Sequence, residues 1–199
     1  MMDYFNPSIL KGRAALVTGG GTGICRGIAL ALAQAGCDVA ITSRSEEHLL
    51  PTAHDLRHAG VRALSVAGDV RKPADVEAVL ARTVESFGRL DVLVNGAAGN
   101  FVCLAENLSP NGFGTVVDID LKGTFNVSRA AFPFLKKQGG AILNISATLQ
   151  LLGTVGQSHG SAAKAGIDAL TRALAAEWGP AGVRVNGLAP GPVEGTEGV

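Results

Sequence analysis

The sequence predicts an α/β fold, a doubly wound parallel sheet with helices on both of its faces. Three observations lead to this prediction. Short, nearly continuous apolar runs, typical of strands buried on both faces, alternate along the chain with segments of helical period. The first strand and its helix are joined by a glycine-rich turn, Gly19–Gly23. A second apolar run follows that helix, so that Ala14–Arg44 forms a βαβ unit of about thirty residues around which the remaining chain is organised.

Each element has its own local signal. The strands are expected at the apolar runs Ala14–Val17, Val39–Thr42, Ala63–Val66, Val92–Val94, Ala141–Ile145 and Arg184–Leu188. Helices are expected at Ile24–Ala35, Glu46–Ala59, Pro73–Phe87 and Ser161–Trp178, and over a long stretch from Gly112 to Phe134. Gly36 ends the first of them, and Gly179 and Pro180 end the last. Pro73 suits the first turn of its helix. Because strand and helix alternate strictly, every connection is a crossover and the sheet is expected to be parallel.

Length and composition limit the class of protein. A chain of 199 residues, 47% of them hydrophobic, suits one domain with a substantial core. The net charge is +0 without a basic block, which argues against nucleic acid and acidic membranes as partners. Three scattered cysteines fit neither a disulfide framework nor a metal-ligand spacing, so we expect no metal site and a reducing compartment. No signal-peptide layout or membrane-spanning run is present, so we expect the cytoplasm, or the peroxisome if the source is eukaryotic.

A sheet of this kind binds ligands beyond the C-terminal ends of its strands. Polar residues and glycines gather in the segments expected there, Gly19–Gly23, Ser43–Arg44, Asp69–Arg71, Asn95–Phe101, Ser146–Leu152 and Pro190–Thr196. Glycines let backbone N–H groups approach an anion at the start of the first helix, so the turn predicts a dinucleotide site. The second strand ends at Ser43-Arg44 where NAD-binding proteins carry an acidic residue, which favours NADPH over NADH. A solvated Arg44 at a helix start is the alternative.

Six motifs, in order along the chain, carry a family resemblance. They are Thr18-Gly19-x-x-x-Gly23-Ile24, Asp69-Val70, Asn95-x-Ala97-x-Gly99, Lys164-Ala165-Gly166, Arg184-Val185-Asn186 and Pro190-Gly191-Pro192. With them the chain resembles the short-chain dehydrogenase/reductase family from about Leu10 to its last residue. The resemblance implies a Rossmann-type fold, a single NAD(P)-binding domain over residues 1–199, and an Asn-Ser-Tyr-Lys catalytic set whose tyrosine protonates a carbonyl oxygen.

Only the lysine of that set, Lys164, is present. Gly160 stands in the place of the tyrosine, Ala147 in that of the serine and Asp120 in that of the asparagine. The only tyrosine of the chain is Tyr4. A ketone reductase needs an acid that protonates the new alkoxide, and the usual donor is missing. Two interpretations stay open: a cofactor-binding relative without catalysis, and an enzyme that reduces something other than a ketone.

Longer segments favour the second interpretation. Asn95–Phe101, Leu108–Asn111, Asp118–Asp120, Gly123–Arg129, Ala175–Pro180 and Gly195–Gly198 resemble the 2,4-dienoyl-CoA reductases, above all their peroxisomal type, in which the tyrosine is also absent. The resemblance implies NADPH-dependent reduction of a 2,4-dienoyl-CoA thioester to a 3-enoyl-CoA in the oxidation of unsaturated fatty acids. A trans-2-enoyl-CoA or 3-oxoacyl reductase on the same scaffold, and a non-catalytic nucleotide-binding module, are the alternatives.

The resemblance also implies roles for individual residues. Asp120 is expected to orient a water that supplies a proton to carbon, and Lys164 to hold the nicotinamide ribose and supply positive charge. The residues expected at the cofactor are Gly19, Gly20, Gly21, Thr22, Gly23, Ile24, Arg44, Asp69, Val70, Asn95, Lys164, Pro190, Gly191, Pro192, Val193 and Thr196. Those expected at the acyl-CoA substrate are Arg71, Phe101, Ser109, Asn111 and His159. For Asp120, Phe101 and His159 a structural role is the alternative.

The chain departs from the family in three further respects. Cys25 replaces the last glycine of the glycine motif, which puts cofactor affinity in question. Gly96 replaces a common second asparagine, which we expect to matter little. Relatives continue past Gly195–Gly198 with a substrate lid, a last parallel strand and much of a subunit interface. We therefore expect a sheet truncated before its last strand, and a homo-oligomer, a tetramer, where the full-length fold is present.

Overall fold

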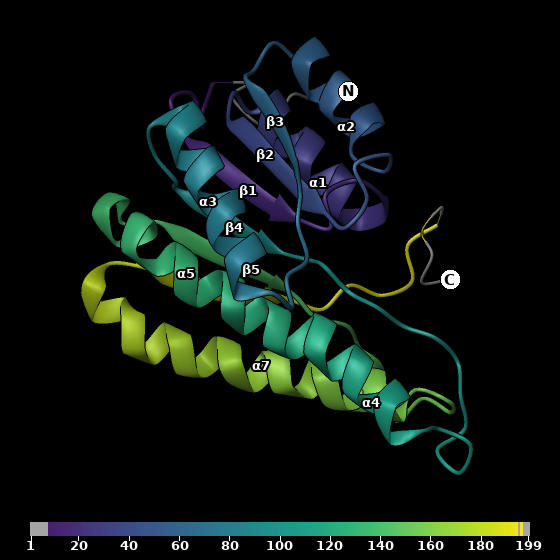
Figure 1. The fold of residues 1–199 in the computed structure, drawn as a ribbon. Coiled ribbons are helices and arrows are strands. Elements are labelled where there is room, and N and C mark those ends of the chain that lie inside the picture. Colours follow the sequence, from purple (N-terminus) through teal and green to yellow (C-terminus); the bar gives the residue numbers. More distant parts are fainter. Residues whose placement is uncertain (1–7, 195, 197–199) are drawn as a thin grey trace.

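The computed structural model describes residues 8–194 and 196, which form one twisted sheet flanked by helices (Figure 1). The strands are β1 Ala14–Thr18, β2 Asp38–Ser43, β3 Ala63–Ala67, β4 Val92–Asn95, β5 Ala141–Ile145 and β6 Arg184–Leu188. All are parallel, in the order β3-β2-β1-β4-β5-β6. The chain runs outward from β1 to β3 and then returns to the other side of β1, so the predicted doubly wound fold class is confirmed.

The predicted sixth strand is part of this sheet, whereas the further strand expected after Gly195–Gly198 would lie outside the described residues. β6 is present and pairs with β5 along its whole length, from the partners Ala141 and Arg184 to Ile145 and Leu188. This ladder uses one edge of β6, and no other described strand pairs with its second edge. Val185 is buried against the helical layer that contains α7, whereas the other residues of β6 are exposed. Among the described residues, β6 is therefore an edge strand with one covered face.

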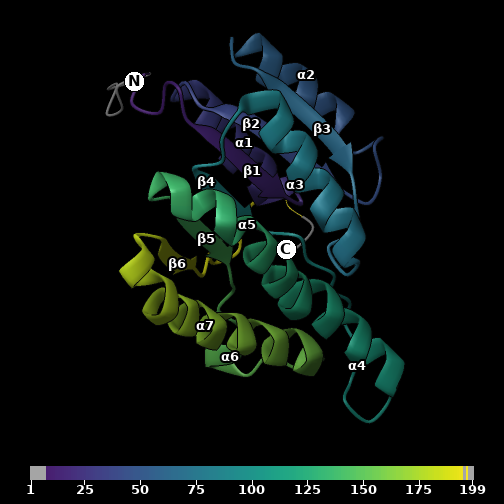
Figure 2. The same cartoon turned by 60° about the vertical axis from the view of Figure 1, so that its left-hand side comes forward.

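The helices lie in two layers. Their bounds are α1 Gly23–Gln34, α2 Leu50–His58, α3 Pro73–Phe87, α4 Pro110–Val117, α5 Gly123–Gln138, α6 Leu149–Leu152 and α7 Ser158–Trp178. One face of the sheet packs against α3, α5 and α7 and the other against α1 and α2 (Figures 1 and 2). The α1 contact uses small residues, Ala29 and Ala33, which let the helix lie close to the strands. In the described part of the chain, no helix is long and apolar enough to cross a membrane.

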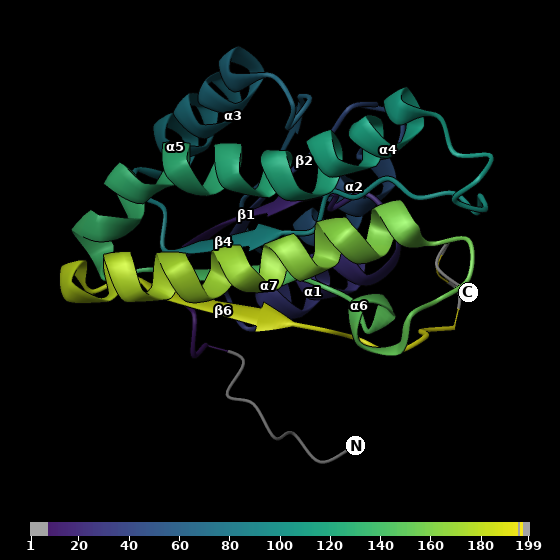
Figure 3. The same cartoon turned by 90° about the horizontal axis from the view of Figure 1, so that it is seen from below.

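The long helix predicted over residues 112–134 is interrupted. Residues Asp118–Lys122 form a π-helical turn between α4 and α5, and the whole assembly runs beside α7 (Figure 3). Such turns are frequent at functional sites, and this one carries Asp120, which is only 2% exposed. Directly after it, Gly123 lies so close to Val70 that a side-chain carbon there would come within 2.6 Å of it. Contacts of this kind depend on the folded chain, which is why hydrophobic period alone predicts an unbroken helix.

The remaining differences concern the ends of elements. α2 begins at Leu50 instead of Glu46, and Pro51 occupies its first turn, where the missing N–H is not needed. α7 begins at Ser158, one turn earlier than predicted. The single turn of α6 is too short to leave a periodic signal in the sequence.

Candidate functional site

The glycine-rich turn leaves β1 at Thr18 and is held between the two neighbouring strands. The Thr18 hydroxyl oxygen accepts hydrogen bonds from the backbone N–H groups of Gly96 (3.0 Å) and Ala97 (3.1 Å), which follow β4. The backbone N–H of Gly19 donates to the carbonyl of Thr42 in β2 at 2.8 Å. The turn is therefore held where the strand order reverses, the place at which doubly wound sheets bind ligands.

Glycine is required at three successive positions of this turn. A side-chain carbon at Gly19 would lie 2.8 Å from the Gly96 carbonyl oxygen, and Gly19 also has a φ of 70°. At Gly20 it would lie 2.7 Å from the side chain of Ile41, so this residue packs against β2. At Gly21 it would overlap a backbone carbonyl of the loop before α2. The three glycines bring the backbone closer to its surroundings than any side chain would allow.

The start of α1 suits an anion. Thr22 makes no side-chain capping bond among the described contacts, and the first turn, Gly23–Arg26, holds no acidic residue. The N–H groups at the start of that turn and the positive end of the helix dipole are thus available to a phosphate, whereas the Arg26 N–H already donates to the Thr22 carbonyl. Thr22, Gly23 and Ile24 all line a cavity, so a ligand can reach them.

Two adjoining cavities run along the turn. The first, of about 420 Å³, is lined among others by Gly19, Gly21, Thr22, Ser43, Arg44, Asp69 and Val70. The second, of about 510 Å³, is lined among others by Thr22, Gly23, Ile24, Ser146, Lys164, Pro190, Gly191, Pro192, Val193 and Thr196. Both include Gly19, Thr22 and Ala98, so they meet at the turn. This layout fits a dinucleotide whose diphosphate lies at the turn and whose two halves extend to either side.

Asp69 and Arg71 bind each other at the edge of the first cavity. The Arg71 guanidinium donates to the Asp69 carboxylate from Nε at 2.9 and 3.0 Å and from Nη2 at 2.5 Å. These side-chain hydrogen bonds lower the pKa of Asp69 to about 2. Arg71, predicted at the substrate, lines neither cavity, because Asp69 engages its guanidinium.

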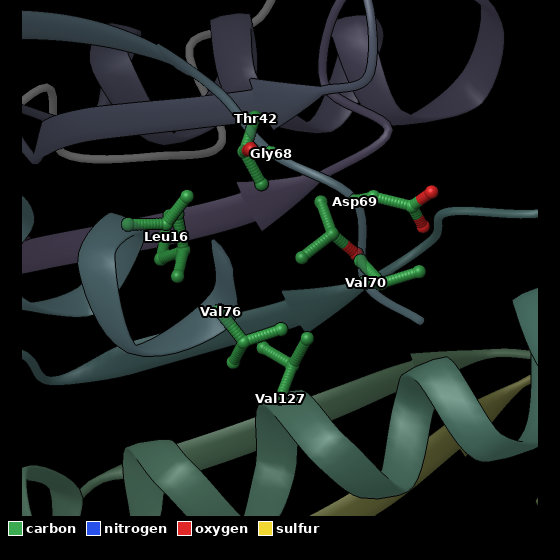
Figure 4. Close-up of a pocket in the computed structure, with 9 residues that line it drawn as sticks. Leu16, Thr42, Gly68, Asp69, Val70, Val76 and Val127 are labelled. Carbon is green, nitrogen blue, oxygen red and sulfur yellow. The ribbon is translucent and has the colours of Figure 1, made fainter. Parts of the chain in front are cut away.

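A small hollow of about 10 Å³ adjoins the first cavity (Figure 4). Leu16, Val76 and Val127 line it with apolar groups, and Asp69 turns its carboxylate away from it (Figure 4). The buried Thr42 Oγ1 has no hydrogen-bond partner in the described part of the chain. The hollow has room for about one water molecule and is a packing gap, too small for a ligand.

Lys164 lines the second cavity and forms a buried ion pair with Asp120, which itself lines neither cavity. Nζ of Lys164 lies 3.0 Å from Oδ2 of Asp120 and donates to the carbonyl of Ile145 at 3.2 Å. The other carboxylate oxygen of Asp120 accepts the backbone N–H of Gly99 at 2.8 Å. Since an ammonium group has three donors, Lys164 keeps one N–H for a ligand in the cavity that it lines.

Asn95 does not reach the cavity, contrary to its predicted place at the cofactor. Its Nδ2 donates to Ser128 at 2.8 Å and to Asn144 at 2.9 Å, and the residue is 3% exposed. Asn144 donates in turn to Thr171 of α7 at 2.9 Å. The side chain of Asn95 is thus used to join β4 and β5 to the helices α5 and α7 beneath the site.

Three of the predicted substrate residues lie near one another. The Phe101 ring lies 4.5 Å from the ring of His159, measured between centroids, and Ser109 accepts the backbone N–H of Gly112 as the N-cap of α4. A side-chain carbon at Gly112 would touch both Phe101 and Ser109, at 3.3 and 3.2 Å. His159 is fully buried, so a direct contact with substrate requires its neighbours to move. Asn111 is exposed on α4 and is not brought into this group.

Two carboxamides that line the second cavity, Asn100 and Gln157, had no predicted role of their own, although Asn100 belongs to the predicted segment Asn95–Phe101. Gln157 precedes Gly160 by about one helical turn, a spacing that could have drawn attention to it. Thr148, from the predicted segment Ser146–Leu152, also lines this cavity. Tyr4 and, apart from Thr196, the segment Gly195–Gly198 lie outside the described residues.

The two departures from the family pattern, at Cys25 and Gly96, are linked because these residues lie against each other. A side-chain carbon at Gly96 would overlap the Cys25 sulfur, so the glycine leaves the room that the thiol fills. The expectation that Gly96 matters little is therefore wrong. Burial raises the pKa of the Cys25 thiol to about 11, against the opposing effect of the Lys164 charge. Cys25 is thus an uncharged packing group in the wall of the second cavity.

A glycine turn that opens the first helix of a doubly wound sheet, with a buried lysine beyond it, defines a Rossmann-type dinucleotide-binding protein. The chain belongs to the short chain dehydrogenase family, whose family model matches residues 13–199. Membership implies a nicotinamide cofactor. The glycine turn and the two adjoining cavities fit such a group.

Individual proteins of known name are similar to most of this chain. The chain is 48% identical to a peroxisomal 2,4-dienoyl-CoA reductase, (3E)-enoyl-CoA-producing, of Arabidopsis thaliana, over 100% of this chain and 70% of the relative. It is 46% identical to the peroxisomal 2,4-dienoyl-CoA reductase SPS19 of Saccharomyces cerevisiae, over 98% and 68%. A solved citronellol catabolism dehydrogenase of Pseudomonas aeruginosa PAO1 matches with a TM-score of 0.90 and 36% identity, over 98% and 80%. The chain thus spans about two thirds of the length of these curated relatives.

Proposed function

We propose that the protein reduces 2,4-dienoyl-CoA thioesters to 3-enoyl-CoA with NADPH, in the oxidation of unsaturated fatty acids. The observation that carries the proposal is the buried Asp120–Lys164 pair beside a glycine at the tyrosine position. This site offers positive charge for an enolate, but Gly160 has no hydroxyl that could protonate an alkoxide. The names of the relatives that are 46–49% identical support the same substrate class.

The two cavities support this assignment of the cofactor residues. The bound nicotinamide nucleotide supplies a hydride to the far end of the conjugated system. The N–H groups at Thr22–Ile24 bind the diphosphate, and Lys164 donates its free N–H to the ribose of the nicotinamide half. Arg44, exposed at the first cavity, pairs with a 2′-phosphate and so selects NADPH.

Hydride addition to a dienoyl thioester leaves negative charge on the thioester oxygen, and the proton is then taken up by the carbon next to the carbonyl. Lys164 stabilises this charge from the cavity wall. Asp120 keeps Lys164 in position, and the lone pairs that it does not use for Lys164 and Gly99 can orient the water that gives the proton. The proton donor, a water molecule, therefore acts at carbon, and no acidic side chain is needed to protonate the oxygen.

One assay tests the proposal against its alternatives. Oxidation of NADPH is followed with 2,4-hexadienoyl-CoA, crotonyl-CoA and acetoacetyl-CoA in parallel, and we expect turnover of the dienoyl thioester. Turnover of crotonyl-CoA alone would identify a trans-2-enoyl-CoA reductase, and turnover of acetoacetyl-CoA alone a 3-oxoacyl reductase. Binding of NADPH without turnover of any thioester would favour a non-catalytic nucleotide-binding module.

The choice of NADPH is tested separately with Arg44→Asp. A carboxylate repels the 2′-phosphate, so we expect the ratio of kcat/KM for NADPH to that for NADH to fall by about tenfold or more. Arg57→Asp, on the exposed end of α2, serves as the control for the loss of one surface arginine. An unchanged ratio in Arg44→Asp would contradict the 2′-phosphate role.

Two further expectations belong with this proposal. The peroxisomal names of the relatives support the peroxisomal alternative, whereas the cytoplasmic prediction is unconfirmed. Assembly into a homo-oligomer, a tetramer, stays a prediction that sedimentation of the purified protein tests.

A further inference from the structure

The place of the missing tyrosine is filled by two carboxamides. Gly160 and Lys164 are four residues apart on α7 and so share one face of that helix. A side-chain carbon at Gly160 would lie 3.1 Å from Oε1 of Gln157 and 3.3 Å from Oδ1 of Asn100. Both carboxamides line the second cavity together with Lys164. Two polar groups thus converge on the position from which a tyrosine side chain would start.

Polar atoms at this point lack partners. Gln157 is 8% exposed, and its Oε1 has no hydrogen-bond partner in the described part of the chain. His159, two residues on, is fully buried, and both of its ring nitrogens are unpartnered within the same described residues. Buried polar atoms are almost always hydrogen-bonded, because leaving them unpaired is unfavourable. A group of them beside a cavity points to a ligand that completes their bonding.

We propose that the carboxamides of Gln157 and Asn100 bind the thioester oxygen of the acyl-CoA substrate in place of the tyrosine hydroxyl. This inference rests on the proposed function. A carboxamide carries an acceptor oxygen and two N–H donors, and rotation about its terminal bond exchanges the group that faces the cavity. Facing inward with N–H, the two side chains donate to the oxygen on which the dienolate charge gathers.

The chemistry of a carboxamide also explains the choice of reaction. Hydride adds to the far carbon, the electrons move to the thioester oxygen, and a proton from water then forms the new C–H bond next to the carbonyl. The carboxamides keep their protons throughout, because they are not acids in the accessible pH range. A ketone would instead leave an alkoxide that has to be protonated at oxygen, which a carboxamide does not do. Gln157 and Asn100 therefore favour conjugated thioesters over ketones.

The test replaces Gln157 in the whole chain and measures kcat and KM with 2,4-hexadienoyl-CoA, the Kd for NADPH and the melting temperature. Gln157→Leu removes the donor at similar size, and we expect kcat to fall by about 10²-fold, as for loss of one oxyanion donor, with the NADPH Kd unchanged. Asn100→Leu should act in the same direction. Gln34→Leu, on the exposed end of α1, is the matched control and should keep full activity.

Gln157→Glu separates oxygen binding from a structural role. It has the shape of glutamine but is an anion near neutral pH, so it should lower kcat more than leucine does. As the pH falls and the carboxyl group gains a proton that it can donate, kcat should recover relative to the wild type. Unchanged kcat in both Gln157 variants, with dienoyl turnover intact in the wild type, would overturn this inference and leave the proposed function standing. Absence of dienoyl turnover in the wild type itself would instead remove the proposed function.

Discussion

The N-terminal half of the fold, β1 to α3, and the C-terminal half, β4 to β6, build their parts of the site by different means. In the first half, β1 is buried along its whole length, and the glycine turn brings backbone groups to the cavity beside side chains such as those of Arg44 and Asp69. In the second half the cavity wall includes the side chains of Asn100, Gln157 and Lys164, and the buried Asp120 pairs with Lys164 behind it.

Buried side-chain atoms without hydrogen-bond partners are also distributed unequally between the two halves. Among the described residues, Thr42 Oγ1 is the one such buried side-chain atom in the first half, whereas the second half contains those of Asn95, Gln150, Gln157 and His159. The exposed apolar side chains of Val102, Leu151, Leu152 and Val155 also belong to the second half. The nucleotide half thus leaves one such atom without a partner, whereas the substrate half presents several groups that a ligand can satisfy.

The largest effect is expected from Asp120→Asn, which tests whether the substrate half works through its charged pair. Asparagine still accepts the Gly99 N–H but no longer carries the charge that faces Lys164, so kcat with the dienoyl thioester should fall by about 10²-fold while the NADPH Kd stays nearly constant. Stopped-flow and fluorescence titration give the two quantities. Asp118→Asn removes an exposed carboxylate from the same π turn and is the control. Undiminished turnover in Asp120→Asn would remove the catalytic role.

A somewhat smaller effect is expected at Gly96, which tests whether the two halves are fitted to each other. Gly96→Asn forces a side chain onto the Cys25 sulfur, and overpacking of about 1–3 kcal/mol would weaken NADPH binding by roughly 10–100-fold. Adding Cys25→Gly should restore much of the affinity, because it empties that space.

Gly27→Asn, on α1 with open space around it, is the control for introducing an asparagine near the turn. The double-mutant cycle measures the coupling of Gly96 and Cys25 directly. Equal affinity losses with and without Cys25→Gly would contradict the steric link.

The smallest effect concerns Asp69 in the nucleotide half. Its pKa is lowered to about 2 by the side-chain hydrogen bonds from Arg71, whereas an unfolded aspartate titrates near about 3.9. The bond therefore stabilises the fold fully above about pH 4 and is lost as the pH falls towards about 2. Urea unfolding should show Asp69→Asn to be less stable than the wild type at about pH 5, with a smaller difference at about pH 3. A difference that does not change with pH would show that Arg71 does not hold this carboxylate.

Much of the fold and of the nucleotide site was predictable. The apolar runs of the sequence predicted all six described strands, because strands buried on both faces are continuously apolar. Most predicted cofactor residues line the two cavities, since the ends of parallel strands meet at one edge. Two of the predicted cofactor residues line neither cavity. Gly20 packs against Ile41, and Asn95 bonds to Ser128 and Asn144, which their places in a motif do not reveal.

The substrate site was less predictable. The π turn at Asp118–Lys122 leaves no trace in hydrophobic period, and Arg71 turns to Asp69 although its position in the chain suits a ligand contact. The role proposed for Gln157 depends on its position beside Gly160, and this contact is visible only in the folded chain.

The order of strands and helices, the parallel sheet and the glycine turn can be read from the sequence, because each depends on residues that are near one another in the chain. Three features become visible only in the folded chain: Asp120 pairs with Lys164, Gly96 makes room for Cys25, and two carboxamides lie at the place of a tyrosine. The first two are contacts between distant segments, and the third brings a residue of the loop after β4 to the start of α7. Their geometry arises when the sheet, the π turn and α7 pack together.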